Sequence, residues 1–228
     1  MNPTASIPAG IEYPETDGLP MAENTKQFRW IVTIKEGIQF LFRDRDDVFV
    51  AGDLFWYPVQ GHPEIRTAPD TLVVFGRPPG DRGSYKQWEE GGIAPQVVFE
   101  VLSPGNTALE MRNKLAFYER YGVVEYYLYD PDDNELEGWI RDGAELVPIG
   151  PMPLWTSPRL GLRFDWDEGG LRLLRPDGRP LETYEEIGER AETERQRAET
   201  AEQRAETAEQ RATRLAERLR ALGIDPDA

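Results

Sequence analysis

One carboxylate stands where the chain otherwise predicts a strand buried on both faces. Residues 95–105 read PQVVFEVLSPG, and Glu100 interrupts their apolar, β-branched run. Such a run is typical of a strand that is covered on both sides. A carboxylate in that position is costly to bury unless it is paired with a cation or bound to a metal. Glu100 is therefore the first candidate for a residue with a chemical role.

Two further charged side chains could join Glu100. Asp70 precedes the predicted strand in APDTLVVFG, and Lys114 lies on a predicted helix, four residues after Glu110. If the strands of Asp70 and Glu100 pair, the carboxylates meet, and a divalent cation would relieve both their repulsion and their burial. Lys114 would reach the same site and place a positive charge on a phosphoryl oxygen or near an attacking water.

Each of these three residues also has a structural interpretation. Glu100 could pair with Arg112 or Arg120 in the core. Asp70 could serve only the turn that follows a proline, and Lys114 could be a solvated lysine on the helix surface. Each of the three residues alone is weak evidence for a catalytic site. Their order along the chain is stronger evidence: an acid before a strand, an acid within the next strand, and a lysine on the helix that follows.

The elements that would position these residues form a mixed sheet with two helices, which is an α/β body. One helix is expected from an N-cap at Asn24 to about Phe42. The second is expected between Thr107, which forms a capping box with Glu110, and a stop at Gly122. Period and composition predict strands in VFVAGDLFWYP, TLVVFG, PQVVFEV, VVEYYLYD, ELEGWIRDG, LGLRFDW and LRLLRP.

Residues 77–94 form a long connection rich in proline and glycine, with a helical turn expected around residues 85–90. Connections of this length are usually functional or mobile. An ordinary surface loop is the simpler interpretation, but contact with a phosphate backbone is an alternative for Arg77, Arg82, Tyr85, Lys86 and Trp88. Asp53, in AGDLFWYP, could add one more acid to the site or lie at a turn or strand edge.

The two ends of the chain differ from this body in composition. Residues 1–20 contain four prolines and few apolar residues, which predicts an extended or disordered arm, with Ile11 and Tyr13 against the body. The body is expected over residues 21–181, and the remaining segment, 182–228, is a tail.

The tail repeats every seven residues from Arg190 onward, as RAETERQ, RAETAEQ, RAETAEQ and RATRLAE. With Ala191 at position a, the a and d positions form a seam of alanine that becomes rich in leucine at its end. This predicts a long helix and a coiled coil that makes a homo-oligomer. A single solvated helix held by Glu–Arg pairs is the alternative, because alanine buries little area.

Composition limits the chemistry further. The chain has 228 residues, no cysteine, a single histidine at His62 and a net charge of −16. The absence of cysteine excludes thiolate nucleophiles and cysteine-based zinc sites, and a single histidine makes a histidine-rich metal site a poor fit. Any metal would then be held by oxygen ligands, which favour a hard cation such as Mg²⁺. The acidity argues against tight, unaided binding of nucleic acid. The sequence shows no targeting or membrane-spanning pattern, so we expect a soluble, cytoplasmic protein.

The segments APDTLVVFG, PQVVFEVLSPGN and RNKLAFYERYGVVEYYLYDPDDNELEGW together resemble the Uma-two family of restriction endonucleases, a branch of the PD-(D/E)XK nuclease superfamily. The resemblance covers about residues 20–175. It implies a restriction-endonuclease-like core, with a mixed central sheet flanked by helices, and Mg²⁺-dependent cleavage of DNA. The superfamily lysine stands two residues after the glutamate, where this chain has Leu102. In this branch the lysine is on the following helix, and Lys114 matches it.

The resemblance implies a role for each site residue. Asp70 and Glu100, together with the main-chain carbonyl of Val101, would hold Mg²⁺, or Mn²⁺ in its place. Bound water would then attack phosphorus in line, and Lys114 would orient or activate that water. The expected function is a metal-dependent DNA endonuclease with weak, salt-sensitive affinity for its substrate. The alternative is a catalytically idle nuclease-like module for interactions, oligomerised by its tail.

Overall fold

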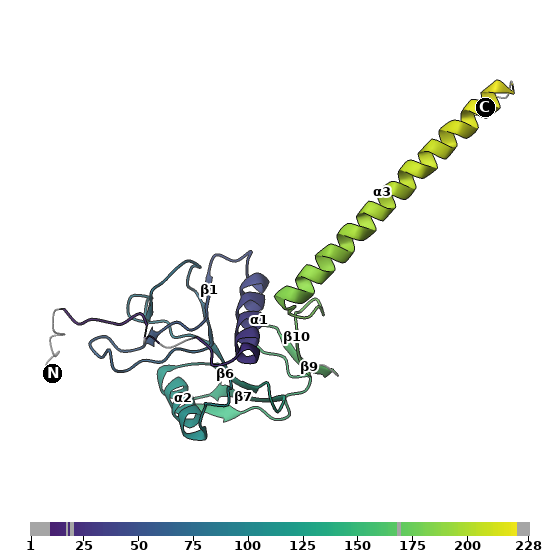
Figure 1. The fold of residues 1–228 in the computed structure, drawn as a ribbon. Coiled ribbons are helices and arrows are strands. Elements are labelled where there is room, and N and C mark those ends of the chain that lie inside the picture. The colour runs from purple at the N-terminus through teal and green to yellow at the C-terminus, as the bar shows by residue number, and fades with distance from the viewer. Residues whose placement is uncertain (1–9, 17, 19–20, 168–169, 223–228) are drawn as a thin grey trace, which may run out of the picture. The chain divides into compact units, whose positions relative to one another are not determined.

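The computed structural model describes residues 10–16, 18, 21–167 and 170–222 (Figure 1). The chain divides into two compact units, Met1–Leu181 and Glu182–Ala228. The first unit contains the two shorter helices and all of the strands among the described residues, and the second contains one long helix. The mixed α/β architecture and the long C-terminal helix agree with the sequence prediction.

A six-stranded sheet forms the centre of the first unit, in the order β1-β3-β5-β6-β7-β8. β5 and β6 are parallel, and every other neighbouring pair in this sheet is antiparallel. The sheet is therefore mixed, as expected. Its strands are β1 (Val48–Ala51), β3 (Thr71–Phe75), β5 (Val97–Val101), β6 (Glu125–Asp130), β7 (Glu135–Asp142) and β8 (Glu145–Pro148).

Capping residues set the limits of the two helices beside the sheet. α1 (Thr25–Leu41) begins at Asn24, whose side chain accepts a hydrogen bond from the backbone N–H of Gln27. α2 (Ala108–Tyr121) begins at Thr107 and ends at Gly122, which has a φ of 97°. Glycine adopts this left-handed conformation without strain, so the helix ends there. Both helices lie where the sequence predicts them.

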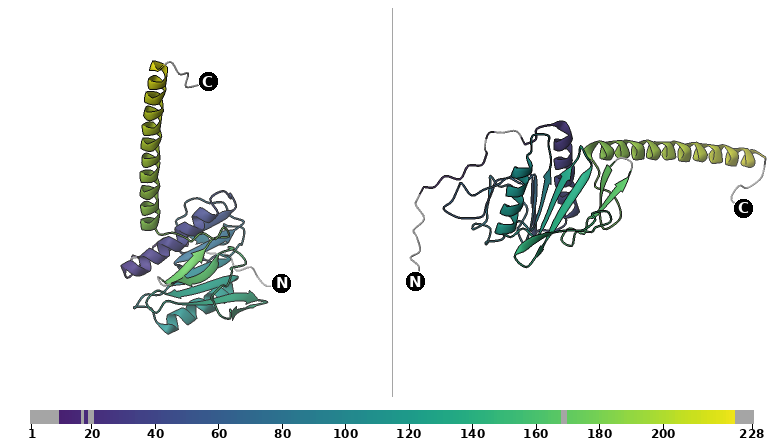
Figure 2. Two further views of the ribbon diagram at one scale, coloured as in Figure 1. Left: turned by 90° about the vertical axis from the view of Figure 1, so that its right-hand side faces the viewer. Right: turned by 90° about the horizontal axis from the view of Figure 1, so that it is seen from below.

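The two faces of the sheet have separate hydrophobic cores. α1 and the hairpin of β9 (Arg163–Asp167) and β10 (Gly170–Leu174) cover one face, where Ile34, Phe99 and Phe164 belong to the same buried cluster. α2 covers the other face, where Val98, Tyr118 and Tyr126 are buried together. Figure 2 shows the helices α1 and α2 on opposite sides of the sheet. Glu100 alternates with Phe99 along β5, so its side chain lies on the α2 face.

The register of the strands aligns several polar residues on that face. Thr71 of β3 lies opposite Phe99, so Asp70 comes opposite Glu100 at the end of this pair. Further along the same row, Glu100 is paired with Leu128, and Leu128 with Glu137. Asp70 and Glu100 are therefore neighbours in a row of paired residues that runs across the strands of the sheet.

The segment VFVAGDLFWYP and the long connection differ from their predictions. A turn with Asp53 at a φ of 48° divides the expected single strand into β1 and β2 (Trp56–Tyr57). The helical turn predicted around residues 85–90 is wrong for its first two residues. Tyr85 and Lys86 form strand β4, which pairs in parallel with β2. Strand β8 was not predicted from the sequence.

The long helix α3 (Tyr184–Ala221) confirms the predicted C-terminal helix. It begins with a capping box in which Thr183 and Glu186 exchange hydrogen bonds. None of its residues is buried, and Leu215 and Leu222, at two d positions of the heptad, are 60% and 75% exposed. Self-association through this surface stays a prediction.

The N-terminal arm is described only in part, because residues 1–9, 17, 19 and 20 lie outside the described residues. Tyr13 packs its ring against Tyr57 and Trp88, and its hydroxyl accepts a hydrogen bond of 2.6 Å from the N–H of Gly61. The described end of the arm therefore lies on the body. Among the described helices, none is both long enough and apolar enough to span a membrane.

Candidate active site

Glu100 lies on the central strand β5 and is 2% exposed. Lys114 of α2 donates a hydrogen bond of 2.9 Å to its Oε2, and the hydroxyl of Tyr118 donates to its Oε1. The cost of burying this carboxylate is thus offset by one cation and one hydroxyl from the helix above it. Its salt-bridge partner is Lys114, and neither of the two arginines considered from the sequence.

Asp70 stands beside Glu100 and directly precedes the neighbouring strand β3. Its Oδ2 accepts a hydrogen bond of 2.7 Å from the backbone N–H of Val101. Burial raises the pKa of Asp70 well above its ordinary value, and the negative charges of Glu100 and Asp53 raise it further against the opposing effect of Lys114. The structure therefore brings Asp70 and Glu100 together, and Asp53 is close enough to act on the same site.

Lys114 is held in this site and is not a solvated surface lysine. Its side chain is 22% exposed. Burial lowers the pKa of Lys114, but the charges of Glu100 and Asp70 outweigh that effect, and the pKa is raised above its ordinary value. Lys114 is accordingly an ammonium group at neutral pH. It supplies one positive charge to a site with two carboxylates.

Two residues of the site were not assigned to it from the sequence. Tyr118 follows Lys114 by four residues on α2, and this spacing on a helix places both over Glu100. Gln27 of α1 is 6% exposed, and its Nε2 donates a hydrogen bond of 2.8 Å to the carbonyl of Val101. The spacing could have revealed Tyr118, but Gln27 is the third residue after the Asn24 cap, where a glutamine is expected for capping alone.

The donors at this site fit a hard cation. Within the described part of the chain, no group of three or more His, Cys, Asp or Glu side chains could hold a metal. Two carboxylates and a main-chain carbonyl are nevertheless suitable ligands for Mg²⁺, which usually keeps several waters. The carbonyl of Val101 retains a second lone pair after accepting from Gln27. A cation here would also offset the repulsion that raises the pKa of Asp70.

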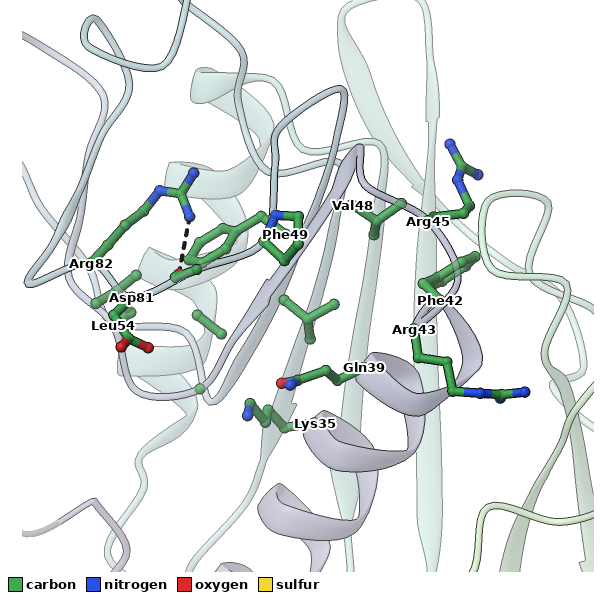
Figure 3. A pocket seen from close by; sticks show the side chains of 15 residues that line it. Lys35, Gln39, Phe42, Arg43, Arg45, Val48, Phe49, Leu54, Asp81 and Arg82 are labelled. Carbon is green, nitrogen blue, oxygen red and sulfur yellow. Dashed lines mark hydrogen bonds between the residues drawn. The ribbon is translucent and has the colours of Figure 1, made fainter.

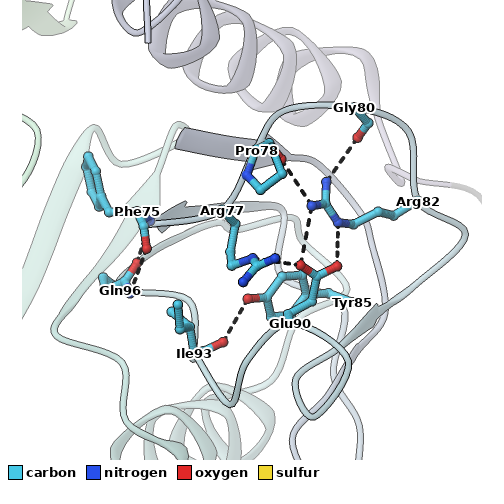
Figure 4. A network of polar contacts seen from close by, with 9 residues as sticks. All are labelled: Phe75, Arg77, Pro78, Gly80, Arg82, Tyr85, Glu90, Ile93 and Gln96. Atoms are coloured by element: carbon cyan, nitrogen blue, oxygen red, sulfur yellow. Dashed lines mark hydrogen bonds and ion pairs between the residues drawn. The ribbon is translucent and has the colours of Figure 1, made fainter. Parts of the chain in front are cut away.

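Hydrogen bonds and ion pairs between its own residues stabilise the long connection of residues 77–94 (Figure 4). Arg77 and Arg82 both contact the carboxylate of Glu90, with Nε–O distances of 3.0 Å and 2.7 Å. The ring of Tyr85 is fully buried, and its hydroxyl donates to the carbonyl of Ile93. These contacts favour the structural interpretation of the loop over direct contact with a phosphate backbone.

A pocket of about 520 Å³ lies between the end of α1, strand β1 and the loop at Arg82 (Figure 3). Several basic side chains line it, but carboxylates close by pair with them. Lys35 lies 2.8 Å from Glu36, and Arg45 makes two contacts of 2.7 Å with Asp47. The pocket therefore offers little unpaired positive charge for a phosphate.

Comparison with known proteins identifies a family and several matching solved structures. The family model Uma2, described as "Putative restriction endonuclease", matches residues 18–173. A crystal structure titled "putative nuclease belonging to DUF820 from Anabaena variabilis ATCC 29413" aligns with 17% identity and a TM-score of 0.47, over 62% of this chain and 76% of that one. No curated protein matches the sequence.

Proposed function

The chain belongs to the Uma2 family of restriction-endonuclease-like proteins, and on this premise we propose that it is a metal-dependent nuclease that hydrolyses phosphodiester bonds of DNA. The observation that carries the proposal is the meeting of Asp70 and Glu100 on one face of the sheet, with Lys114 2.9 Å from Glu100. A buried site with two acids and one ammonium suits a reaction in which negative charge develops on phosphoryl oxygens.

Asp70, Glu100 and the carbonyl of Val101 would hold the Mg²⁺ or Mn²⁺ ion. When bound, such an ion lowers the pKa of a coordinated water and stabilises charge on the phosphoryl oxygens. The chain's own residues fix the ligands. Tyr118 orients Glu100 through Oε1, and Gln27 orients the Val101 carbonyl. Ligands that are fixed by outer hydrogen bonds lose less freedom when an ion binds.

Lys114 supplies a positive charge that does not depend on the ion. Because it is an ammonium group, it can donate a hydrogen bond but cannot accept the proton of the attacking water. We assign it to orienting that water or a phosphoryl oxygen. A lysine on α2 can replace a lysine on the strand of Glu100, since only the position of the charge matters.

The charge of the molecule limits how the substrate binds. A net charge of −16 repels a polyanion at long range, so affinity for DNA should be weak and should fall quickly as salt rises. The assay therefore belongs at low ionic strength.

A second candidate is a catalytically idle interaction module. Both oxygens of Glu100 already have partners within the protein, as in a structural ion pair, and the heptad surface of α3 is exposed. If the chain is such a module, it should self-associate but not hydrolyse DNA.

Cleavage of plasmid DNA separates the two candidates. Native protein should nick the plasmid in Mg²⁺ or Mn²⁺ and not in EDTA, and Glu100→Gln and Asp70→Asn should each lower the rate by orders of magnitude. Glu135→Gln is the matched control, because Glu135 is an exposed acid on β7. Circular dichroism checks that each variant is folded. No metal-dependent cleavage of DNA or RNA by the native chain would favour the idle module.

A further inference from the structure

A second pocket, of about 340 Å³, opens beside the candidate active site. It lies between the first half of α2 and strands β6 and β7. Leu128, one of its lining residues, is the partner of Glu100 in the strand register. Neighbouring strands are about 4.8 Å apart, so the pocket begins one strand away from Glu100. It is lined by Leu102, Asn106, Thr107, Ala108, Met111, Arg112, Leu115, Tyr126, Leu128, Glu137 and Trp139.

Tyr126 forms part of the wall of this pocket. None of its surface is exposed, and its hydroxyl has no hydrogen-bond partner among the residues that the structure describes. Burial raises the pKa of Tyr126, and the charges of Glu100 and Asp70 raise it further, so the hydroxyl keeps its proton. The buried hydroxyl is therefore not accessible from the pocket, and Tyr126 contributes only to the packing of the wall.

The walls of the pocket suit a flat, partly polar ring. Trp139 lies parallel to Tyr126, with ring centroids 5.1 Å apart and an interplanar angle of 19°. Met111 and Leu115 of α2 and Leu128 of β6 supply apolar contact. Glu137, exposed on β7, is a hydrogen-bond acceptor at the rim. The volume is near the lower end of the range for ligand pockets, which fits one small ring system and excludes a duplex.

We propose that this pocket binds one unpaired base of the nucleic acid whose phosphate lies at Asp70 and Glu100. The inference rests on the proposed nuclease function, because adjacency to that site identifies the ring as a nucleobase. The base lies among the apolar side chains against Trp139, and Glu137 accepts a hydrogen bond from an exocyclic amino group. Enzymes that modify a base hold a single extruded base in a pocket of comparable kind.

The charge of the protein makes such a pocket useful. An acidic body gains little from phosphate contacts, so contacts with the base must supply much of the affinity. Stacking of a base on an aromatic side chain changes affinity by about five- to a hundredfold. The substrate class that follows is DNA or RNA with at least one unpaired nucleotide at the cleavage position.

Binding measured in EDTA tests the pocket independently of catalysis. The probes are short, fluorescently labelled single strands of oligo(dC), oligo(dT), oligo(C) and an abasic backbone of the same length, with a blunt duplex beside them, all at low salt. Fluorescence anisotropy should show oligo(dC) bound about five- to a hundredfold more tightly than the abasic strand and the duplex. Oligo(dC) should also exceed oligo(dT), which lacks an exocyclic amino group, and oligo(C) shows whether RNA is equally suitable.

Variants locate the effect in the pocket. Trp139→Leu should bring the ratio of oligo(dC) to abasic affinity close to one. Glu137→Gln should remove the preference for oligo(dC) over oligo(dT), whereas Glu135→Gln, on the same strand but outside the pocket, should keep it. Both of these exposed positions tolerate the change without a risk to folding.

Three results would overturn the inference. They are equal affinity for base-containing and abasic strands, no binding of any probe, and identical behaviour of Glu137→Gln and Glu135→Gln. Failure of the nuclease proposal is a different outcome, since a chain that never cleaves but still prefers bases keeps the pocket and loses the catalytic site. Cleavage without any base preference would support the catalytic site and contradict base binding in the pocket.

Discussion

Lys114 and Glu100 form a hydrogen-bonded ion pair of 2.9 Å that joins helix α2 to the central strand of the sheet. The pair lies beside a second carboxylate, Asp70, so one ammonium group serves two acids. The excess of negative charge is what distinguishes this site from an ordinary buried ion pair. We therefore expect the two acids to bind a further cation, and the predictions below test this expectation.

Replacement of Lys114 by methionine should abolish turnover without abolishing metal binding. The variant keeps the length of the side chain but removes the charge nearest Glu100, so a divalent ion meets less repulsion and should bind equally well or more tightly. Isothermal titration with Mn²⁺ measures the affinity, and plasmid nicking measures turnover. Lys26→Met, at an exposed position, is the control. Loss of Mn²⁺ binding in Lys114→Met would show that the lysine holds the site together.

The stability of the metal-free protein should fall as the pH rises, because of Asp70. Its folded-state pKa is raised by burial and by Glu100, so the folded chain holds this proton more tightly than the unfolded chain does. The resulting stabilisation is fully present below the ordinary value of 3.8 and is lost as the pH rises through the raised pKa. Asp70→Asn should remove this loss and be the more stable form at neutral pH.

Urea unfolding in EDTA at a series of pH values measures that difference. The Asn variant can still accept the hydrogen bond from the N–H of Val101, so the comparison isolates the charge. Parallel stability curves for the native chain and Asp70→Asn would contradict the prediction.

A divalent ion should stabilise the native chain and not the variants that lack a ligand. At about one hundred times its dissociation constant, an ion that binds only the folded state adds about 2.7 kcal/mol. For a domain of this size, that corresponds to a rise in melting temperature of about 5–10 °C. Differential scanning fluorimetry with Mn²⁺ should show the rise for the native chain and no rise for Asp70→Asn or Glu100→Gln. Equal shifts in all three would place the ion elsewhere.

Removal of the Tyr118 hydroxyl should separate the positioning of Glu100 from the structure of the core. Tyr118→Phe keeps the ring that lies parallel to Trp56 but takes away the donor to Oε1 of Glu100. A hydrogen bond to a charged group contributes about 1.5–3 kcal/mol to stability. We expect a loss of this size, together with weaker Mn²⁺ binding. Tyr129→Phe, which loses a hydrogen bond to Asn134 on the other face, should lower stability without weakening Mn²⁺ binding.

The long helix should mediate self-association. Light scattering should give a multiple of the chain mass for the full protein and a single chain mass for a version that ends at Thr183, because the seam of α3 is then absent. Substitution of Leu215 and Leu222 by glutamine, at two d positions, should weaken association, whereas Glu217→Gln, outside the seam, should not. A monomeric full chain would identify α3 as a solvated single helix.

Local patterns in the sequence predicted the three helices and most of the strands, and they identified Asp70, Glu100 and Lys114 as candidate site residues. Asn24, Thr107 and Gly122 mark helix ends because capping depends only on neighbouring backbone groups. The apolar run around Glu100 indicated a doubly covered strand, and all five residues of β5 are buried. A charge within such a strand must have a partner, so the sequence alone identified it as exceptional.

Tertiary structure decided which groups meet. The sequence left Lys114, Arg112 and Arg120 as candidate neighbours of Glu100, and the rotation of α2 over the sheet selected Lys114. Gln27 reaches Val101 only because α1 crosses the end of β5. The pairing of β2 with β4 and the pocket at Tyr126 depend in the same way on segments far apart in the chain. Contacts of this kind depend on how whole elements pack, which short-range periodicity does not encode.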